Sequence, residues 1–125
     1  MTDNKATSKK VSELAVTGIL EKKGHDIVVL DLKGIDGAIC DYFVICHGTS
    51  RPQVEAIMDS VDWTIKKETG QNPFHVEGTQ NAEWVLVDYV DVVVHIFIEE
   101  KRQFYKLESL WADAPKQVIE DPEKN

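Results

Sequence analysis

The stretch that decides the fold is Trp84-Val-Leu-Val-Asp-Tyr-Val-Asp-Val-Val-Val-His-Ile-Phe97. It predicts two apolar strands joined by a turn that carries Asp88, Tyr89 and Asp91. Strands this apolar must be covered on most of their surface, so they belong inside a layered domain. An aromatic residue between two carboxylates also suits a surface that grips another macromolecule. No nucleophile with its base lies nearby in the sequence, so the run favours binding over catalysis.

Strand geometry divides this run into two faces. Trp84, Leu86 and Asp88 share one face, and the residues between them point to the other. An unpaired Asp88 is costly to bury, so we expect the sheet to become exposed toward the turn. Two interpretations stay open. Either Tyr89 and the two carboxylates form a contact surface, or aspartate stabilises the turn and the tyrosine simply faces solvent.

Length and charge limit the classes of function. The 125 residues fit one domain that is large enough for a core. Fourteen basic against 22 acidic residues give a formal net charge of −8. Such a field repels phosphate backbones, so we expect no direct sequence-specific binding of nucleic acid. A basic protein partner is favoured instead.

The cysteines and the chain's first residues indicate a cytoplasmic location. Cys40 and Cys46 form no CxxC pair, so we expect buried free thiols in a reducing compartment. The first ten residues have no apolar core and do not form a signal peptide. The longest apolar stretch is far shorter than the roughly 20 residues that cross a bilayer, so no membrane association is expected.

The remaining pattern predicts an α/β fold. Polar residues 1–7 and 114–125 are expected to be flexible tails around a single domain over 8–113. The predicted order is α-β-β-α-β-β-β-α, with helices packed on a mixed sheet of about five strands. In the last helix Phe104, Leu107 and Trp111 share a face, which we assign to the core. The preceding charged cluster, residues 99–102, is expected to be a solvated helix start.

The clearest helix start lies at Ser50-Arg51-Pro52-Gln53, a capping box in which the Ser50 hydroxyl and the Gln53 amide each satisfy a free backbone N–H. The preceding Gly48-Thr49-Ser50 is similar to the short Gly-Ser turn of nucleotidyltransferases, at a place that suits anions. Those enzymes also need paired metal-binding acids on the next strand. Here Asp88 and Asp91 bracket a turn instead, and the nearer acids fall on the helix: Glu55, Asp59 and Asp62. Helix capping is favoured, and a metal-dependent nucleotidyltransferase is the alternative.

Other patterns of reactive residues are absent from the sequence. The four histidines show no HxxxH or HxH spacing, so no metal site is predicted. His95 lies among valines and is expected to be a hydrogen-bonded, partly buried imidazole. Neither a GxSxG nor a Cys-His pattern appears, so we expect no catalytic residue and no cofactor.

Two blocks of the chain resemble a known family. The first block is Asp41-Tyr-Phe-Val-Ile-Cys46 followed by Gly48-Thr-Ser50 and Gln53-Val54. The second is Glu77-Gly78, Ala82-Glu-Trp-Val-Leu-Val-Asp88 and Asp91-Val-Val-Val-His-Ile-Phe97. Arg102, Tyr105, Leu107-Glu108 and Leu110-Trp111 complete the match over about residues 10–113. On these blocks the chain is similar to the ribosomal silencing factors, also called RsfS, Iojap or YbeB.

The resemblance implies a non-enzymatic regulator of translation. Members bind the fourteenth protein of the large ribosomal subunit and block joining of the small subunit, and free members are often homodimers. Their fold is similar to that of nucleotidyltransferases without the catalytic acids.

The family's contact surface maps onto five residues of this chain: Trp84, Val87, Asp88, Tyr89 and Asp91. Where the family usually has glycine in the turn, this chain has Val90. Because valine disfavours a left-handed backbone, we expect the turn to take another shape.

Overall fold

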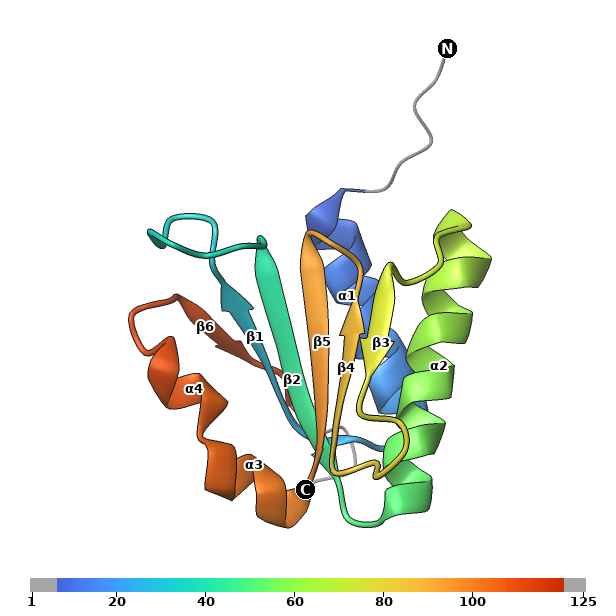
Figure 1. Ribbon diagram of the computed structural model, residues 1–125. Helices are drawn as coiled ribbons and strands as arrows, with labels where there is room; N and C mark the ends of the chain where they lie inside the picture. The colour runs from blue at the N-terminus through green and yellow to red at the C-terminus, as the bar shows by residue number, and fades with distance from the viewer. Residues whose placement is uncertain (1–6, 121–125) are drawn as a thin grey trace.

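The computed structural model describes residues 7–120 as one mixed sheet of six strands with helices on both faces (Figure 1). The strand order is β3-β4-β5-β2-β1-β6. Helices α1 and α2 cover one face, and the shorter α3 and α4 lie on the other. The elements are α1 Ser8–Glu21, β1 His25–Asp31, β2 Tyr42–Gly48, α2 Arg51–Thr69, β3 His75–Glu77, β4 Trp84–Asp88, β5 Val92–Ile98, α3 Glu99–Tyr105, α4 Leu107–Leu110 and β6 Lys116–Val118.

The centre of the sheet is a parallel pair. β2 and β5 run side by side from Tyr42 opposite Val92 to Gly48 opposite Ile98. The other four pairings are antiparallel. All seven residues of β2 are buried, as expected for a strand with neighbours on both edges and helices on both faces. The predicted α/β class is confirmed.

Local sequence explains where α2 begins and ends. The Ser50 hydroxyl accepts a hydrogen bond from the Gln53 N–H at 3.2 Å, and the Gln53 side-chain oxygen accepts one from the Thr49 N–H at 2.8 Å. The predicted capping box is therefore confirmed, with Thr49 as the second donor. Gly70 ends the helix in a left-handed conformation, with φ of 77°. The apolar stripe of α2 is buried against the sheet: Val54, Ile57, Val61 and Ile65.

The number of strands differs from the expected five. The sixth strand, β6, lies in the segment that the sequence predicted to be a flexible tail, so the fold extends past residue 113. All three β6 side chains are exposed. The strand is held by backbone pairing with β1, in which Val118 lies opposite Val28 and Lys116 opposite Leu30. The tails predicted over 1–6 and 121–125 lie outside the described residues.

The last predicted helix is two short helices. Lys106 has φ of 51°, and this left-handed residue separates α3 from α4. Because of the break, Phe104 does not share a helical face with Leu107 and Trp111. It is 71% exposed, so its assignment to the core is wrong. Leu107 is buried, and Trp111 packs edge-on against Phe43 with ring centroids 5.7 Å apart. Within residues 7–120 no helix has the length and apolar character needed to cross a membrane.

Candidate functional site

The turn between β4 and β5 lies at the upper edge of the sheet in Figure 1 and has an unusual backbone. The Val90 N–H donates to the Asp88 side chain at 2.7 Å, and the Tyr89 N–H donates to the Val92 carbonyl at 2.8 Å. The Asp91 N–H returns to the Tyr89 carbonyl at 2.9 Å. Val90 itself has φ of 76°. Valine was expected to disfavour a left-handed backbone, but Val90 adopts one.

The structure separates the five residues predicted to contact a partner. Asp91 is exposed, and Trp84 and Asp88 are partly exposed. In contrast, Val87 is fully buried and Tyr89 is only 7% exposed, and both belong to the core beneath α1 and α2. Their side chains therefore support the turn from inside, and a solvent-facing Tyr89 is also ruled out. Burial, together with the carboxylate of Asp62, raises the pKa of the Tyr89 hydroxyl.

Aromatic side chains gather at the other end of β4. Trp84 stacks on Phe97 with ring centroids 4.9 Å apart and lies 4.7 Å from the ring of Tyr105. Tyr105 in turn meets Phe104 edge-on at 5.1 Å. Phe104 and Tyr105 are both exposed, and Tyr105 lies beside Trp84. We define the β4 surface as these aromatic residues with the outward side chains that follow them: Trp84, Phe104, Tyr105, Leu86, Asp88 and Asp91.

Sequence reasoning missed the exposed aromatic pair of α3. Residues two apart on a helix point about 200° away from each other, so burial of Arg102 turns Phe104 outward. The exposure of Phe104 could have been predicted only from the burial of Arg102. Sequence alone does not predict that burial, because charged residues are seldom buried.

His95 fixes the indole of Trp84. The Trp84 Nε1–H donates to His95 Nδ1 at 3.1 Å, so the neutral imidazole must carry its proton on Nε2. His95 is almost fully buried, and this burial lowers its pKa to about 4. The predicted hydrogen-bonded imidazole is confirmed, with deeper burial than expected. At neutral pH the neutral ring holds the tryptophan in one orientation.

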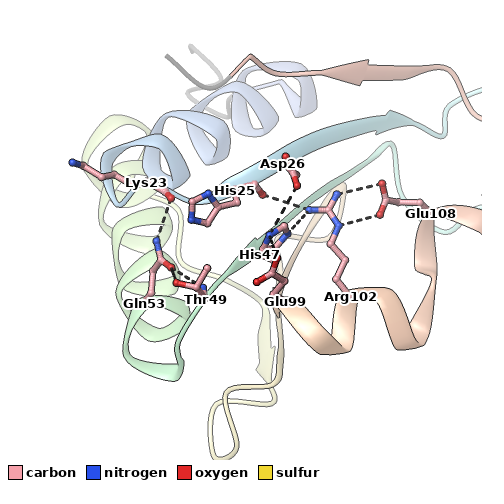
Figure 2. A network of polar contacts seen from close by, with 9 residues as sticks. All are labelled: Lys23, His25, Asp26, His47, Thr49, Gln53, Glu99, Arg102 and Glu108. Atoms are coloured by element: carbon pink, nitrogen blue, oxygen red, sulfur yellow. Dashed lines mark hydrogen bonds and ion pairs between the residues drawn. The ribbon is translucent and has the colours of Figure 1, made fainter. Parts of the chain in front are cut away.

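The glycine-containing turn before α2 is filled by a side chain of this protein (Figure 2). The Gln53 oxygen accepts from the Thr49 N–H and from its hydroxyl, at 2.8 and 3.2 Å. The Gln53 amide nitrogen donates to the carbonyls of Lys22 and Lys23, each at 3.1 Å. A phosphate at this turn would have to displace the glutamine from four hydrogen bonds. The arrangement therefore favours capping over a nucleotidyltransferase site.

A second polar network surrounds Arg102, which is buried although it belongs to the cluster expected to be solvated. Its guanidinium donates twice to the Glu108 carboxylate, at 3.1 and 3.2 Å. It also donates to His47 Nδ1 at 3.0 Å and to the His25 carbonyl at 3.4 Å. The expected solvated helix start is therefore wrong for Arg102. This residue ties α3 and α4 to β1 and β2.

The Arg102 contact also sets the protonation of His47. Arginine only donates, so Nδ1 of His47 accepts and Nε2 carries the proton. Nε2 faces the carboxylates of Asp26 and Glu99, each at 4.0 Å. Burial and the positive charge of Arg102 lower the pKa of His47, while the two carboxylates oppose them. At neutral pH this cluster is a closed structural network around a neutral imidazole.

The remaining reactive side chains have ordinary structural roles. Within residues 7–120, no three His, Cys, Asp or Glu side chains are grouped so that they would hold a metal ion. Cys40 and Cys46 are buried free thiols, as predicted. Burial raises the pKa of Cys40 to about 11 and that of Cys46 to about 12, so neither is a thiolate at neutral pH.

Comparisons with known proteins match nearly the whole chain. The family model described as "Ribosomal silencing factor during starvation" matches residues 5–125. Ribosomal silencing factor RsfS of Bacillus subtilis (strain 168) is 44% identical over 110 residues, which cover 86% of this chain and 89% of that protein. The RsfS of Halalkalibacterium halodurans is 41% identical over 114 residues, covering 91% and 96%.

A solved structure agrees with the sequence matches. A crystal structure of a protein from Chromobacterium violaceum has a TM-score of 0.80 and 31% sequence identity, and the match covers 94% of this chain and 98% of that one. The resemblance predicted from the two sequence blocks is thus confirmed by sequence and by fold. The chain belongs to the ribosomal silencing factor family.

Proposed function

We propose that this protein binds the large ribosomal subunit through its fourteenth protein and sterically blocks joining of the small subunit. The observation that carries the proposal is the β4 surface, where the exposed Phe104 and Tyr105 of α3 lie at one end of β4 near the partly exposed Trp84, and carboxylates lie at the other end of the strand and in its turn. Exposed aromatic clusters of this kind are typical anchors of protein interfaces. Family membership supplies the ribosome as the partner.

The charges of the β4 surface suit a basic ribosomal protein. Asp91 is exposed and Asp88 partly so, and the chain as a whole has a formal charge of −8. Complementary charge accelerates encounter and fixes the orientation of the partners, so association should be faster at low salt. The proposal requires no chemistry, because a bound domain excludes the small subunit by its volume. We place this activity in the cytoplasm.

The aromatic end of the surface provides the anchor. Trp84 is held from beneath by His95 and Phe97, so little conformational freedom is lost when a partner covers it. Phe104 and Tyr105 enlarge the contact at the same end. Val87 and Tyr89, which the sequence resemblance maps onto the contact surface, act in this proposal by supporting β4 and its turn from the core.

Co-sedimentation with isolated large subunits tests the proposal. We expect Phe104→Ala to weaken binding about tenfold and Trp84→Ala about thirtyfold or more, the loss typical of interface anchors. Trp63→Ala is a matched control, because Trp63 is 64% exposed on α2, on the opposite face of the sheet. Phe104 is so exposed that its truncation should leave the melting temperature unchanged.

The charged part of the surface is tested in the same assay. Asp88→Asn keeps the side-chain oxygen that accepts the Val90 N–H and removes only the charge. Combined with Asp91→Asn it should weaken binding and flatten its salt dependence. Glu55→Gln with Asp59→Asn removes the same charge from exposed positions of α2 and should do neither. Wild-type binding by all the β4 surface variants would refute the site.

The β4 surface also suits self-association of the free protein. We propose that the free protein forms a homodimer through exposed apolar side chains near α3, and that the dimer therefore competes with the subunit. Sedimentation velocity of the free protein should then show a dimer that Phe104→Ala weakens. If Phe104→Ala leaves the dimer unaffected, the dimer interface and the subunit-binding β4 surface are different.

A further inference from the structure

Val90 combines backbone strain with exposure. Its φ of 76° and the hydrogen bond from the Asp91 N–H to the Tyr89 carbonyl define a γ-turn with positive φ at the central residue, which is rare and strained. Of the non-glycine residues with positive φ in the described part of the chain, Val90 is the β-branched one. A left-handed backbone is a marked outlier for such a side chain.

The surrounding structure holds this strain in place. The Asp88 side chain accepts the Val90 N–H, and the Tyr89 N–H is bonded to Val92 across the turn. On the other side, the Asp91 carbonyl accepts the backbone N–H groups of Asp41 and Tyr42, at 2.8 and 3.2 Å. The buried Tyr89 ring fixes the base of the turn. Strain persists where neighbours over-determine the backbone, and such sites cluster at functional surfaces.

The Val90 side chain contributes little to the stability of the folded monomer. It is 57% exposed, so the isopropyl group is mostly outside the core. Glycine would adopt the same backbone without strain. Stability of the folded monomer alone therefore does not explain the valine at this position. A contact of its side chain with another molecule would explain it.

The neighbours of Val90 indicate the chemistry of that contact. Val90 lines an open hollow of about 540 Å³ between the turn, the first turn of α1 and the end of α2. Phe74, another exposed apolar residue, lies on the same hollow. Among the described residues that line it, Asp91 is the charged one. Exposed apolar side chains, uncharged polar groups and one carboxylate suit a long cationic side chain, whose methylene stem packs on the apolar groups while its head pairs with the acid.

We propose that Val90 is a specificity-determining contact residue, and that a lysine or arginine side chain of the partner lies in this hollow against Val90 and Phe74 with its head group on Asp91. The inference rests on the proposed function, because the partner is the same basic ribosomal protein. It assigns to the turn a contact separate from the aromatic anchors of the β4 surface.

Val90→Gly separates folding from binding, because the two effects have opposite signs. Relief of strain should raise the melting temperature by about 4 °C. Loss of the apolar wall should weaken co-sedimentation with large subunits about tenfold, which corresponds to about 1.4 kcal/mol. Val90→Ala removes two methyl groups but relieves only part of the strain, so it should weaken binding while raising the melting temperature less than Val90→Gly does. Val118→Ala, at an exposed valine of β6, is the control and should change neither.

The outcomes distinguish this inference from the proposed function. If Val90→Gly and Val90→Ala bind within about twofold of wild type while Phe104→Ala is weakened, the hollow carries no contact and the inference fails alone. If the wild-type protein does not sediment with large subunits, both proposals fail. A more stable Val90→Gly variant with weakened binding would support the inference.

Discussion

Two regions of the molecule differ in what their side chains contact. The first comprises the polar networks around Arg102 and Gln53, and the second is the β4 surface with its turn. In the networks, Arg102, His47 and Gln53 bond to other groups of the same chain. On the β4 surface, aromatic rings are exposed and a valine is held in a strained backbone. Gln53 fills the turn before α2, which is the place where the nucleotidyltransferase alternative would require a phosphate. Polar groups that are hydrogen-bonded within the chain indicate a structural role. Exposed aromatic side chains and a strained backbone at Val90 indicate the candidate interface.

The largest expected effect tests whether the Arg102 network is structural. Glu108→Ala leaves a buried guanidinium without its carboxylate and should lower the free energy of unfolding by about 3 kcal/mol. Urea denaturation measures this loss. Glu100→Ala removes a carboxylate from an exposed position of α3 and should cost far less. Equal losses for the two variants would mean that the network does not hold α3 and α4 to the sheet.

A smaller expected effect is the pH dependence of the free energy of unfolding caused by His95, which is buried beneath Trp84 of the β4 surface. Because the pKa of His95 falls from 6.5 when unfolded to about 4 when folded, the unfolded chain binds more protons between these values. Stability is therefore complete above pH 6.5 and falls as the pH decreases through this window, by about 2 kcal/mol from pH 6.5 to 5. The lowered pKa of His47 acts in the same direction.

Substitutions test whether His95 causes this pH dependence. His95→Gln should reduce the slope of unfolding free energy against pH between 5 and 7, measured by urea denaturation. Gln103→Ala, which removes no titratable group from an exposed position of α3, should preserve the wild-type slope. The assignment to His95 is wrong if His95→Gln leaves the slope unaltered. In the folded protein His95 becomes protonated only near pH 4, where it would lose its acceptor role toward the Trp84 Nε1–H, so binding by the β4 surface should persist at pH 5 and weaken near pH 4.

The smallest expected effect concerns Gln53. Gln53→Ala removes the side chain that bonds Thr49, Lys22 and Lys23, and should cost about 1 kcal/mol in urea denaturation. Gln103→Ala on α3, at an exposed position, is the control. Calorimetry with a nucleoside triphosphate and Mg²⁺ should show no binding by wild type or by Gln53→Ala. Metal-dependent binding by either protein would restore the nucleotidyltransferase alternative.

Much of the fold follows from the sequence because its signals are local. The Ser50 capping box, the apolar stripe of α2 and the run from Trp84 to Phe97 each depend on neighbouring residues, and each formed as predicted. β6 carries no such signal, since its side chains are exposed and backbone pairing with a distant strand holds it. Contacts between distant segments are invisible to residue periodicity.

The candidate site was predictable in position but not in its side chains. The sequence placed it on β4 and its turn, and it correctly expected exposure of the sheet near Asp88. Burial of Tyr89 depends on α2, and exposure of Phe104 depends on the left-handed Lys106 and on the buried Arg102. The positive φ of Val90 opposes local propensity, and the hydrogen bonds of its neighbours impose it.

Photo-crosslinking from the β4 surface tests the central claim most directly. Phe104→benzoylphenylalanine keeps an exposed aromatic ring at the proposed interface, and Trp63→benzoylphenylalanine places the same probe on the opposite face. After irradiation with isolated large subunits, the account predicts that the probe at position 104 crosslinks to the fourteenth ribosomal protein and that the probe at position 63 does not. Crosslinking of position 63 to that protein, or of position 104 only to other components, would contradict the account.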